Sequence, residues 1–257
     1  MSGSTIDLAS SRDWYAYFVS NSSSDDDLPW DCSYQLTEGE RHAVSKSVQQ
    51  FQLGEGAGGR RLLARGQAWS ATVGDPCFES VLGLFIKEEQ RHSRLLSRFM
   101  RRERIPELTS HWLDGVFRRI RVLAGLELEL RVLVTAEIIA VPYYRALGAA
   151  TQSHLLRSIS DTILADEAAH LRFQKSMLAR LAAPRRPALR CLVWQLHRLF
   201  LAGTCCVVWI EHRAVFKAAG YSFGGLLEEA LGEISALEAP SIVPRKMGRA
   251  TVAAADY

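Results

Sequence analysis

The chain has 257 residues, of which 48% are hydrophobic and 23% charged, and its formal net charge is +3 at pH 7. This composition is that of a soluble globular protein long enough to bury a substantial core. So small a charge argues against nucleic acid as the main partner. The five cysteines form no Cys-x-x-Cys pair and no secretory leader opens the chain, so we expect reduced thiols and a cytoplasmic location.

Residues 1–34 are predicted to form a partly flexible extension. The segment 20–27 contains only serine, asparagine and aspartate, a composition that does not support a packed core. Four aromatic residues stand just before it and indicate that the N-terminus still docks on the body of the protein: Trp14, Tyr15, Tyr17 and Phe18.

The middle of the chain has apolar residues at helical spacing, interrupted by proline and glycine, with no alternating strand pattern. The pattern predicts four long helices, over the ranges 35–71, 77–101, about 120–149 and 153–182. The first two helices turn between Val73 and Pro76, and the last two turn near Thr151. Each pair is therefore expected to form an antiparallel hairpin.

One four-residue motif occurs twice in these helices. Glu89 and His92 form the first Glu-x-x-His motif, and Glu167 and His170 form the second. Positions three apart lie on one face of a helix, so each motif directs a carboxylate and an imidazole towards a common point. Carboxylate oxygen and imidazole nitrogen form a ligand set for iron, manganese or zinc.

Each motif has a partner glutamate on the preceding helix of its hairpin. Glu55 lies 18 residues before the first bend and Glu89 lies 16 after it, which corresponds to about 27 and 24 Å of helix. Glu137 lies 14 residues before the second bend and Glu167 lies 16 after it. The two carboxylates of each hairpin are therefore expected to be nearly level.

The surroundings of the two partner glutamates are unusual. Glu137 stands in an apolar run, Val132–Val141, with no other ionisable side chain, so its carboxylate is expected to be buried. A buried carboxylate needs a cation or hydrogen bonds, and metal ligation supplies the cation. Glu55 is flanked by glycines, which weaken a helix by about 1 kcal/mol each. They indicate close helix approach or open space for substrate, with a break in the helix as the competing interpretation.

Two glutamates and two Glu-x-x-His motifs in this order resemble the ferritin-like superfamily of diiron and dimanganese carboxylate proteins. The resemblance covers residues 35–182. It implies an all-α fold, a ferritin-like antiparallel four-helix bundle with additional C-terminal helices in 183–257. It also implies two bound iron ions, or alternatively manganese or a mixed manganese and iron pair, held by Glu55, Glu89, His92, Glu137, Glu167 and His170.

Beyond the resemblance, the sequence predicts one helix over 187–219 and a shorter one near 223–237. The longest apolar stretch, Leu199–Ile210, has twelve residues, whereas a membrane span needs about 20. We interpret it as part of a buried helix and expect no membrane contact.

A further ligand from this region is not favoured. His197 lies among apolar residues and is interpreted as a core histidine, while Glu211 and His212 stand near the helix end, where an exposed or capping role is expected. Some superfamily members with nitrogen-oxidising activity carry an additional histidine one turn before the second motif. This chain has Ile163 there, which counts against that subgroup.

Three residues near the motifs are candidates for supporting roles. Glu88 and Asp166 each precede a motif glutamate, and a metal-bound histidine usually donates its other N–H to a carboxylate or carbonyl. Exposure to solvent is the alternative for both. Tyr144 follows Glu137 by seven residues on the same helix face, and core filling is favoured over a redox or hydrogen-bonding role.

These observations favour a diiron enzyme that activates O2 to oxidise a small organic substrate. A dimanganese or diiron protein that removes peroxide is the main alternative, and a non-enzymatic metal-binding protein is the third. If a substrate pocket reaches the metals, we expect its wall to be thinnest at four small residues: Gly54, Gly56, Ala57 and Gly58. The chain has no cysteine set for electron transfer, so any reductant comes from an external electron donor or from the substrate, and association into a homo-oligomer is compatible with this class.

Overall fold

The computed structural model describes residues 10–21, 28–56, 59–112, 115, 125–182 and 186–238. Over these residues the protein is helical and contains no strand, which confirms the expected all-α class. The helices are α1 Ser11–Ser20, α2 Glu38–Glu55, α3 Arg60–Val73, α4 Cys77–Arg102, α6 Leu126–Ala149, α7 His154–Ala182, α8 Pro187–Ala218 and α9 Phe223–Glu238.

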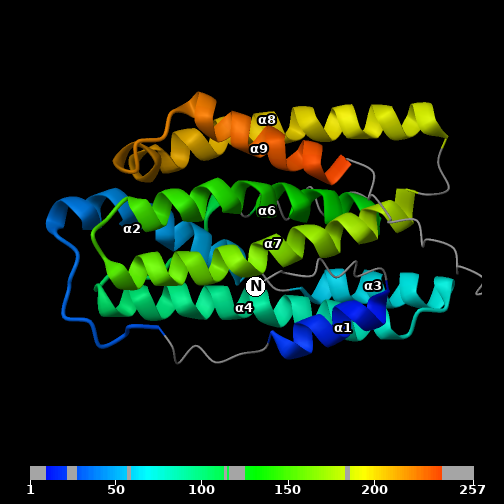
Figure 1. Cartoon of the computed structure of the whole chain (residues 1–257), viewed down its shortest axis with the longest axis horizontal. Helices are drawn as coiled ribbons and strands as arrows, with labels where there is room; N and C mark the ends of the chain where they lie inside the picture. The colour runs from blue at the N-terminus through cyan, green and yellow to red at the C-terminus, as the bar shows by residue number, and fades with distance from the viewer. Residues whose placement is uncertain are drawn as a thin grey trace, which may run out of the picture.

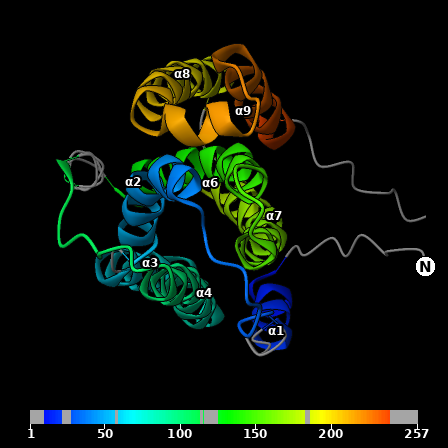
Figure 2. The ribbon, with the colours of Figure 1, turned by 90° about the vertical axis from the view of Figure 1, so that its left-hand side faces the viewer.

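The helices form three layers, which are clearest in the end-on view of Figure 2. Helices α8 and α9 lie on one side of α6 and α7, and α4 lies on the other side with α1 and α3 (Figure 1). The contact between α6 and α7 is the most extensive of all, while α2 packs against α4 and α8. The predicted hairpins are therefore present, with α4 also packed against α7.

The first predicted helix is wrong in one respect, because 35–71 is two helices rather than one. Helix α2 ends at Glu55, and α3 begins at Arg60 after the glycine-rich segment. The glycines serve close packing as well as the break: a Cβ atom on Gly59 would lie 2.3 Å from Ile86 on α4. Glu55 is therefore the last residue of α2, because the glycines that follow it end the helix.

Local signals explain where α2 and α3 begin and end. Thr37 caps the start of α2, because its hydroxyl accepts from the backbone N–H of Glu40 while the Glu40 carboxylate accepts from the backbone N–H of Thr37. Gly74 ends α3 with a φ of 69°, a left-handed conformation that favours glycine. Glu55 thus ends α2, and the bend after α3 leads directly into α4.

The N-terminal aromatic group docks on the body as predicted, although α1 itself was not expected to be a helix. Trp14 and Phe18 are buried, and both rings pack against Phe173 of α7 at centroid distances of 5.4 and 5.6 Å. Tyr15 is exposed. The segment predicted to be flexible lies mostly outside the described residues, since only its first two residues are included.

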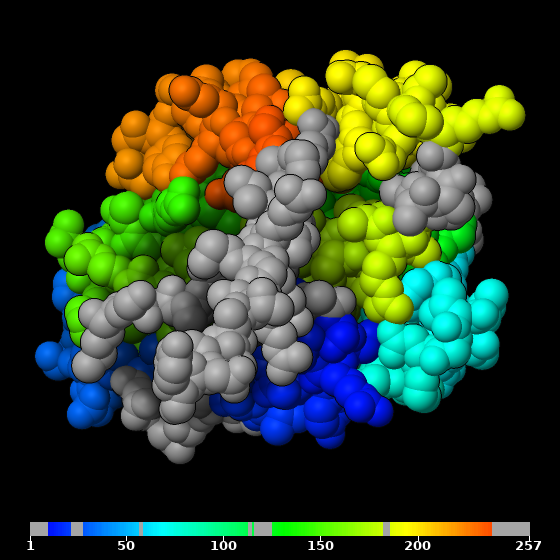
Figure 3. Space-filling model, turned by 45° about the vertical axis from the view of Figure 1, so that its right-hand side comes forward, coloured from blue at the N-terminus to red at the C-terminus, as the bar shows by residue number. Residues whose placement is uncertain are grey.

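The expectation that Leu199–Ile210 is part of a buried helix is wrong. Large apolar side chains remain exposed along α8, with Leu199 at 70% and Ile210 at 68%, and Figure 3 shows α8 in yellow on the outer surface. By length and composition alone, both α6 and α8 could cross a membrane. However, 78% of the apolar 18-residue segment is buried inside the protein in α6, and only 28% in α8. Helix α8 thus packs on α6 and α2 with one face and presents apolar side chains with the other.

Candidate metal centre

Four helices bring all six predicted ligands together. Glu55 ends α2, Glu89 and His92 lie on α4, Glu137 lies on α6, and Glu167 and His170 lie on α7. They form two overlapping groups, each of which can hold a metal ion because its ligand atoms all lie within 4.8 Å of one another. The first group consists of Glu55, Glu89, His92 and Glu167, and the second of Glu89, Glu137, Glu167 and His170.

The polar atoms at the centre of the cluster lack hydrogen-bond partners among the described residues. These buried atoms are Nδ1 of both histidines, Oε1 of Glu89 and both carboxylate oxygens of Glu167. The closest approach of histidine to carboxylate within this set is 3.0 Å, between His170 Nδ1 and Glu89 Oε1, and each histidine Nδ1 also lies 3.5 Å from an oxygen of Glu167. Buried polar atoms without partners are costly, so their convergence on one space is the arrangement that a cation would satisfy.

The outer nitrogens of the two histidines are held in a crossed pattern. His92 Nε2 on α4 lies 2.9 Å from Asp166 on α7, and His170 Nε2 on α7 lies 2.9 Å from Glu88 on α4. Both supporting carboxylates are buried, so the alternative of solvent exposure is wrong for each. With Nε2 occupied, each ring presents Nδ1 to the centre, as expected for a metal-binding histidine.

Asn21 at the end of α1 joins the two supporting carboxylates. Its Nδ2 atom donates to Glu88 at 2.9 Å and to Asp166 at 2.8 Å, and the guanidinium of Arg91 also donates to Asp166. Sequence reasoning missed Asn21 because it stands in a serine and aspartate tract with no helical pattern of its own. The aromatic group before it was the available signal, since it docks α1 beside the centre.

The two partner glutamates each have one oxygen held by a neutral donor. Tyr144 donates its hydroxyl to Glu55 Oε1 at 2.5 Å, and Gln174 donates from Nε2 to Glu137 Oε1 at 2.9 Å. Tyr144 is therefore both a core residue and a hydrogen-bond donor, and Gln174 was not anticipated from the sequence. Each glutamate keeps its Oε2 atom for the centre.

The cluster holds protons at neutral pH in the absence of a cation. Burial, together with the charges of Glu137 and Glu55, raises the pKa of Glu89 to about 8. Burial acts to lower the pKa of His92, but its interactions with Asp166 and Glu55 outweigh burial and raise the pKa to about 9. Four carboxylates this close cannot all ionise without positive charge, and a metal ion supplies that charge.

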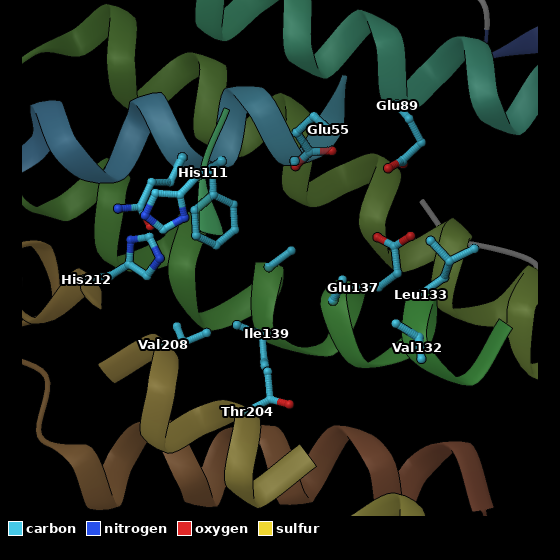
Figure 4. Close-up of a pocket in the computed structure, with 15 residues that line it drawn as sticks. Glu55, Glu89, His111, Val132, Leu133, Glu137, Ile139, Thr204, Val208 and His212 are labelled. Carbon is cyan, nitrogen blue, oxygen red and sulfur yellow. The ribbon is translucent and has the colours of Figure 1, made fainter. Parts of the chain in front are cut away.

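A cavity of about 180 Å³ opens beside the cluster. Glu55, Glu89 and Glu137 line it, whereas His92 and His170 do not. Figure 4 shows Glu89 and Glu137 at one end of the cavity and His111 and His212 at the other. The carboxylate side of the centre is thus the side that a small molecule can approach.

Two of the four small residues predicted to form a thin pocket wall, Gly54 and Gly56, lie within the described residues. Gly54 lines the cavity, and a Cβ atom built on it meets nothing within 4 Å, so the expected open space is present there. A Cβ atom on Gly56 would instead lie 2.9 Å from the Ser93 hydroxyl, so this glycine permits close packing. Ala57 and Gly58 lie outside the described residues.

Of the two histidines that the sequence places on α8, one lies as predicted and the other does not. His197 is a core histidine, as expected, with Nε2 2.9 Å from the Thr135 hydroxyl and Nδ1 3.3 Å from the Arg131 guanidinium. His212 was expected to be exposed or capping, and this is wrong: it is buried, lines the cavity and lies 2.7 Å from the Ser47 hydroxyl. The prediction missed that α8 turns this end towards α2. Ile163 is buried in the core.

The described residues therefore define a helical protein with a buried carboxylate and histidine cluster that can hold a metal ion. No protein-family model matches the chain, and a search of curated proteins finds no significant match. The geometry of the cluster and its cavity is therefore the basis for assigning a function.

Proposed function

We propose that the protein is a ferritin-like dinuclear metal enzyme that activates O2 to oxidise a small organic substrate. The observation that carries the proposal is the overlap of the two ligand groups, because Glu89 and Glu167 belong to both. If two ions are bound, Glu89 and Glu167 would be available to both, while Glu55 with His92 and Glu137 with His170 would each hold one. In this proposal α2, α4, α6 and α7 are the four helices of the ferritin-like bundle.

The donor set favours iron, with manganese or a mixed pair as the alternatives. It consists of carboxylate oxygens and imidazole nitrogens, which suit iron and manganese, and it lacks the thiolate or thioether ligands that favour copper(I). With two such ions bound, the centre supplies two-electron chemistry with O2. The electrons for an oxygenase cycle come from the substrate or from an external donor.

The chain's own residues position and shield the centre. The crossed pairs of His92 with Asp166 and His170 with Glu88 fix both rings. Phe85, which is buried, packs edge-on against the His170 ring at a centroid distance of 4.7 Å and shields that ring from solvent. The accessible side is lined by apolar residues and by the carboxylates themselves, so substrate and oxygen meet the centre from the same direction.

The cavity favours oxidation of an organic molecule over removal of peroxide. A protein that only admits peroxide or ions needs a narrow polar channel, whereas this cavity has mostly apolar walls that include Val132, Ile139 and Val208. Peroxide removal by a dimanganese or diiron centre is the second candidate. Such a protein would use the same ligands, but its cavity would admit peroxide instead of an organic substrate.

The test is metal loading followed by reaction with oxygen. We expect the anaerobic protein to take up two Fe²⁺ per chain by elemental analysis, and the reduced, loaded protein to change its absorption spectrum on exposure to O2. Glu167→Gln removes one of the two shared ligands and should abolish both metal uptake and the reaction with O2. Glu79→Gln, on an exposed part of α4, should leave both unchanged. Absence of metal uptake by the unmodified protein would refute the site, and fast turnover of peroxide would favour the second candidate.

A further inference from the structure

The cavity beside the cluster has a second polar end that the metal ligands do not explain. Gln50 of α2, His111 and His212 of α8 line it, and Figure 4 shows His111 and His212 on the side opposite Glu89 and Glu137. Apolar residues such as Ile139 and Val208 lie between the two ends. The cavity therefore offers hydrogen bonding at one end, an apolar middle, and the carboxylate cluster at the other end.

Gln50 is the most informative residue of the polar end. Its side chain is 9% exposed, and its Oε1 atom has no hydrogen-bond partner among the described residues. Its amide also bonds to the carboxylate of Glu211. Because a carboxylate only accepts hydrogen bonds, the NH2 group must be the one that points to Glu211. The carbonyl oxygen is then the atom left to accept a hydrogen bond from a bound molecule.

Among its described lining residues the polar end has no permanently charged cation that would attract an anion. Burial lowers the pKa of His212 to about 4, so its imidazole is neutral at pH 7. Glu211, the neighbour of Gln50, is already paired with Lys46 at 2.8 Å. Among the described lining residues there is no lysine or arginine. The end is suited to a neutral group rather than to a carboxylate or phosphate.

The dimensions of the cavity limit the molecule further. Gln50 and Glu55 are five residues apart on α2, which corresponds to about 7.5 Å along the helix. The cavity volume of about 180 Å³ is below the roughly 300–1,000 Å³ of sites for drug-sized ligands. A molecule that reaches from one end to the other therefore has about the length of a benzene ring with a substituent at each end.

We propose that the cavity binds a small, neutral, amphipathic molecule in a fixed direction. A hydroxyl or amide N–H group donates to Gln50 Oε1, and the apolar body lies between Ile139 and Val208. The opposite apolar end then lies beside Glu55 and the metal centre. Binding stands on the cavity alone, while oxidation of the apolar end rests on the proposed function.

Helix α8 is what makes this end selective. Thr204, Val208 and His212 are spaced by four residues, so they share one face of the helix, and all three line the cavity. This helix lies outside the segment that resembles the ferritin-like pattern. The structure thus assigns metal binding to α2, α4, α6 and α7, and recognition of the distal polar group to α8 together with Gln50.

The test uses three probe molecules of similar shape: 4-methylbenzyl alcohol, p-xylene, which lacks the hydroxyl, and 4-methylbenzoate, which is anionic. Binding to the full-length protein is measured by titration calorimetry, with and without added metal. We expect the alcohol to bind about ten-fold more tightly than p-xylene, the difference that one buried hydrogen bond supplies, and the benzoate not to bind. Gln50→Met should lower the affinity for the alcohol to the affinity for p-xylene.

Controls separate this inference from the proposed function. Gln49→Met changes the adjacent glutamine, which bonds to the Pro106 carbonyl on the surface, and should leave all three affinities unchanged. Val208→Phe should fill the cavity and remove binding of every probe. Thermal unfolding and metal content are recorded for each variant.

Each result has a definite meaning. Preference for the alcohol that Gln50→Met removes supports the inference, even if the protein takes up no metal, in which case only the proposed function fails. If the protein binds two metal ions but takes p-xylene or the benzoate as tightly as the alcohol, or takes none of the probes, the inference is wrong while the metal centre stands.

Discussion

His92 on α4 and Asp166 on α7 lie 2.9 Å apart through Nε2 and Oδ2. Asp166 directly precedes the glutamate of the second motif, so each motif orients the histidine of the other, with Glu88 and His170 as the reciprocal pair. The two hairpins are therefore coupled at the centre through side chains, and a shift of one motif displaces the other.

The first prediction concerns Asn21, which connects the two supporting carboxylates. Asn21→Leu should weaken metal binding by about ten-fold, the lower limit for loss of a residue that supports metal ligands. The reason is that Glu88 and Asp166 lose a shared donor and hold the imidazole rings less firmly. Affinity is measured by competition with a chromophoric chelator. Ser20→Ala, which affects only an exposed hydroxyl on α1, is the control, and equal affinities in the two variants would contradict the prediction.

The second prediction concerns pH and metal binding. Because the pKa of Glu89 is raised to about 8 and that of His92 to about 9 in the absence of a cation, protons compete with metal at neutral pH. Metal affinity should therefore rise between pH 6.5 and pH 8, with release of protons on binding. Calorimetry in buffers of different ionisation enthalpy measures the protons released, and an affinity that falls over this range would contradict the prediction.

Metal removal should destabilise the protein, which is the third prediction. Metal that binds the folded state alone adds about 4 kcal/mol to the free energy of unfolding at 1,000 times the dissociation constant. Chelation should therefore lower the melting temperature measured by circular dichroism, and added Mn²⁺ should restore it. In Glu167→Gln the melting temperature should not respond to metal, because each ligand group loses one of the two carboxylates that the groups share.

A fourth prediction uses the open space at Gly54. Gly54→Leu places a side chain in the cavity next to Glu55 without a clash, and should abolish binding of organic probes while folding and metal content persist. Replacing glycine within a helix should also raise stability, by up to about 1 kcal/mol. Gly83→Leu on α4 is the matched control, since it has equal open space but does not line the cavity. Loss of metal from Gly54→Leu would show that the side chain displaces Glu55 instead.

The fifth prediction concerns acid stability and His197. Burial, with the nearby Arg131 charge, lowers the pKa of His197 to about 4 from 6.5. The unfolded state therefore binds a proton that the folded state rejects, so the free energy of unfolding falls as pH decreases from about 6.5 towards 4. His197→Gln should reduce this slope in urea unfolding experiments. His154→Gln, at an exposed position, should leave the slope unchanged, and identical slopes in both variants would contradict the assignment.

The sequence by itself determined the helices and the content of the centre. A period of about 3.6 residues, broken by Gly74 and by the turn near Thr151, is a local property, so α4, α6 and α7 were predictable to within a few residues. The spacing of Glu and His on one helix face, and equal distances from the bends, then brought the six ligands to one level. These inferences needed only helix geometry.

Only the tertiary structure decided which elements meet beyond the hairpins. Asn21 reaches the centre because α1 packs on α4 and its aromatic rings contact Phe173 of α7. His212 reaches the cavity because α8 turns one face towards α2. Neither contact has a periodic signal, since each joins residues far apart in the chain. The exposed apolar face of α8 was missed for the same reason: composition states how apolar a helix is, but only packing against its neighbours determines how much of that surface is buried.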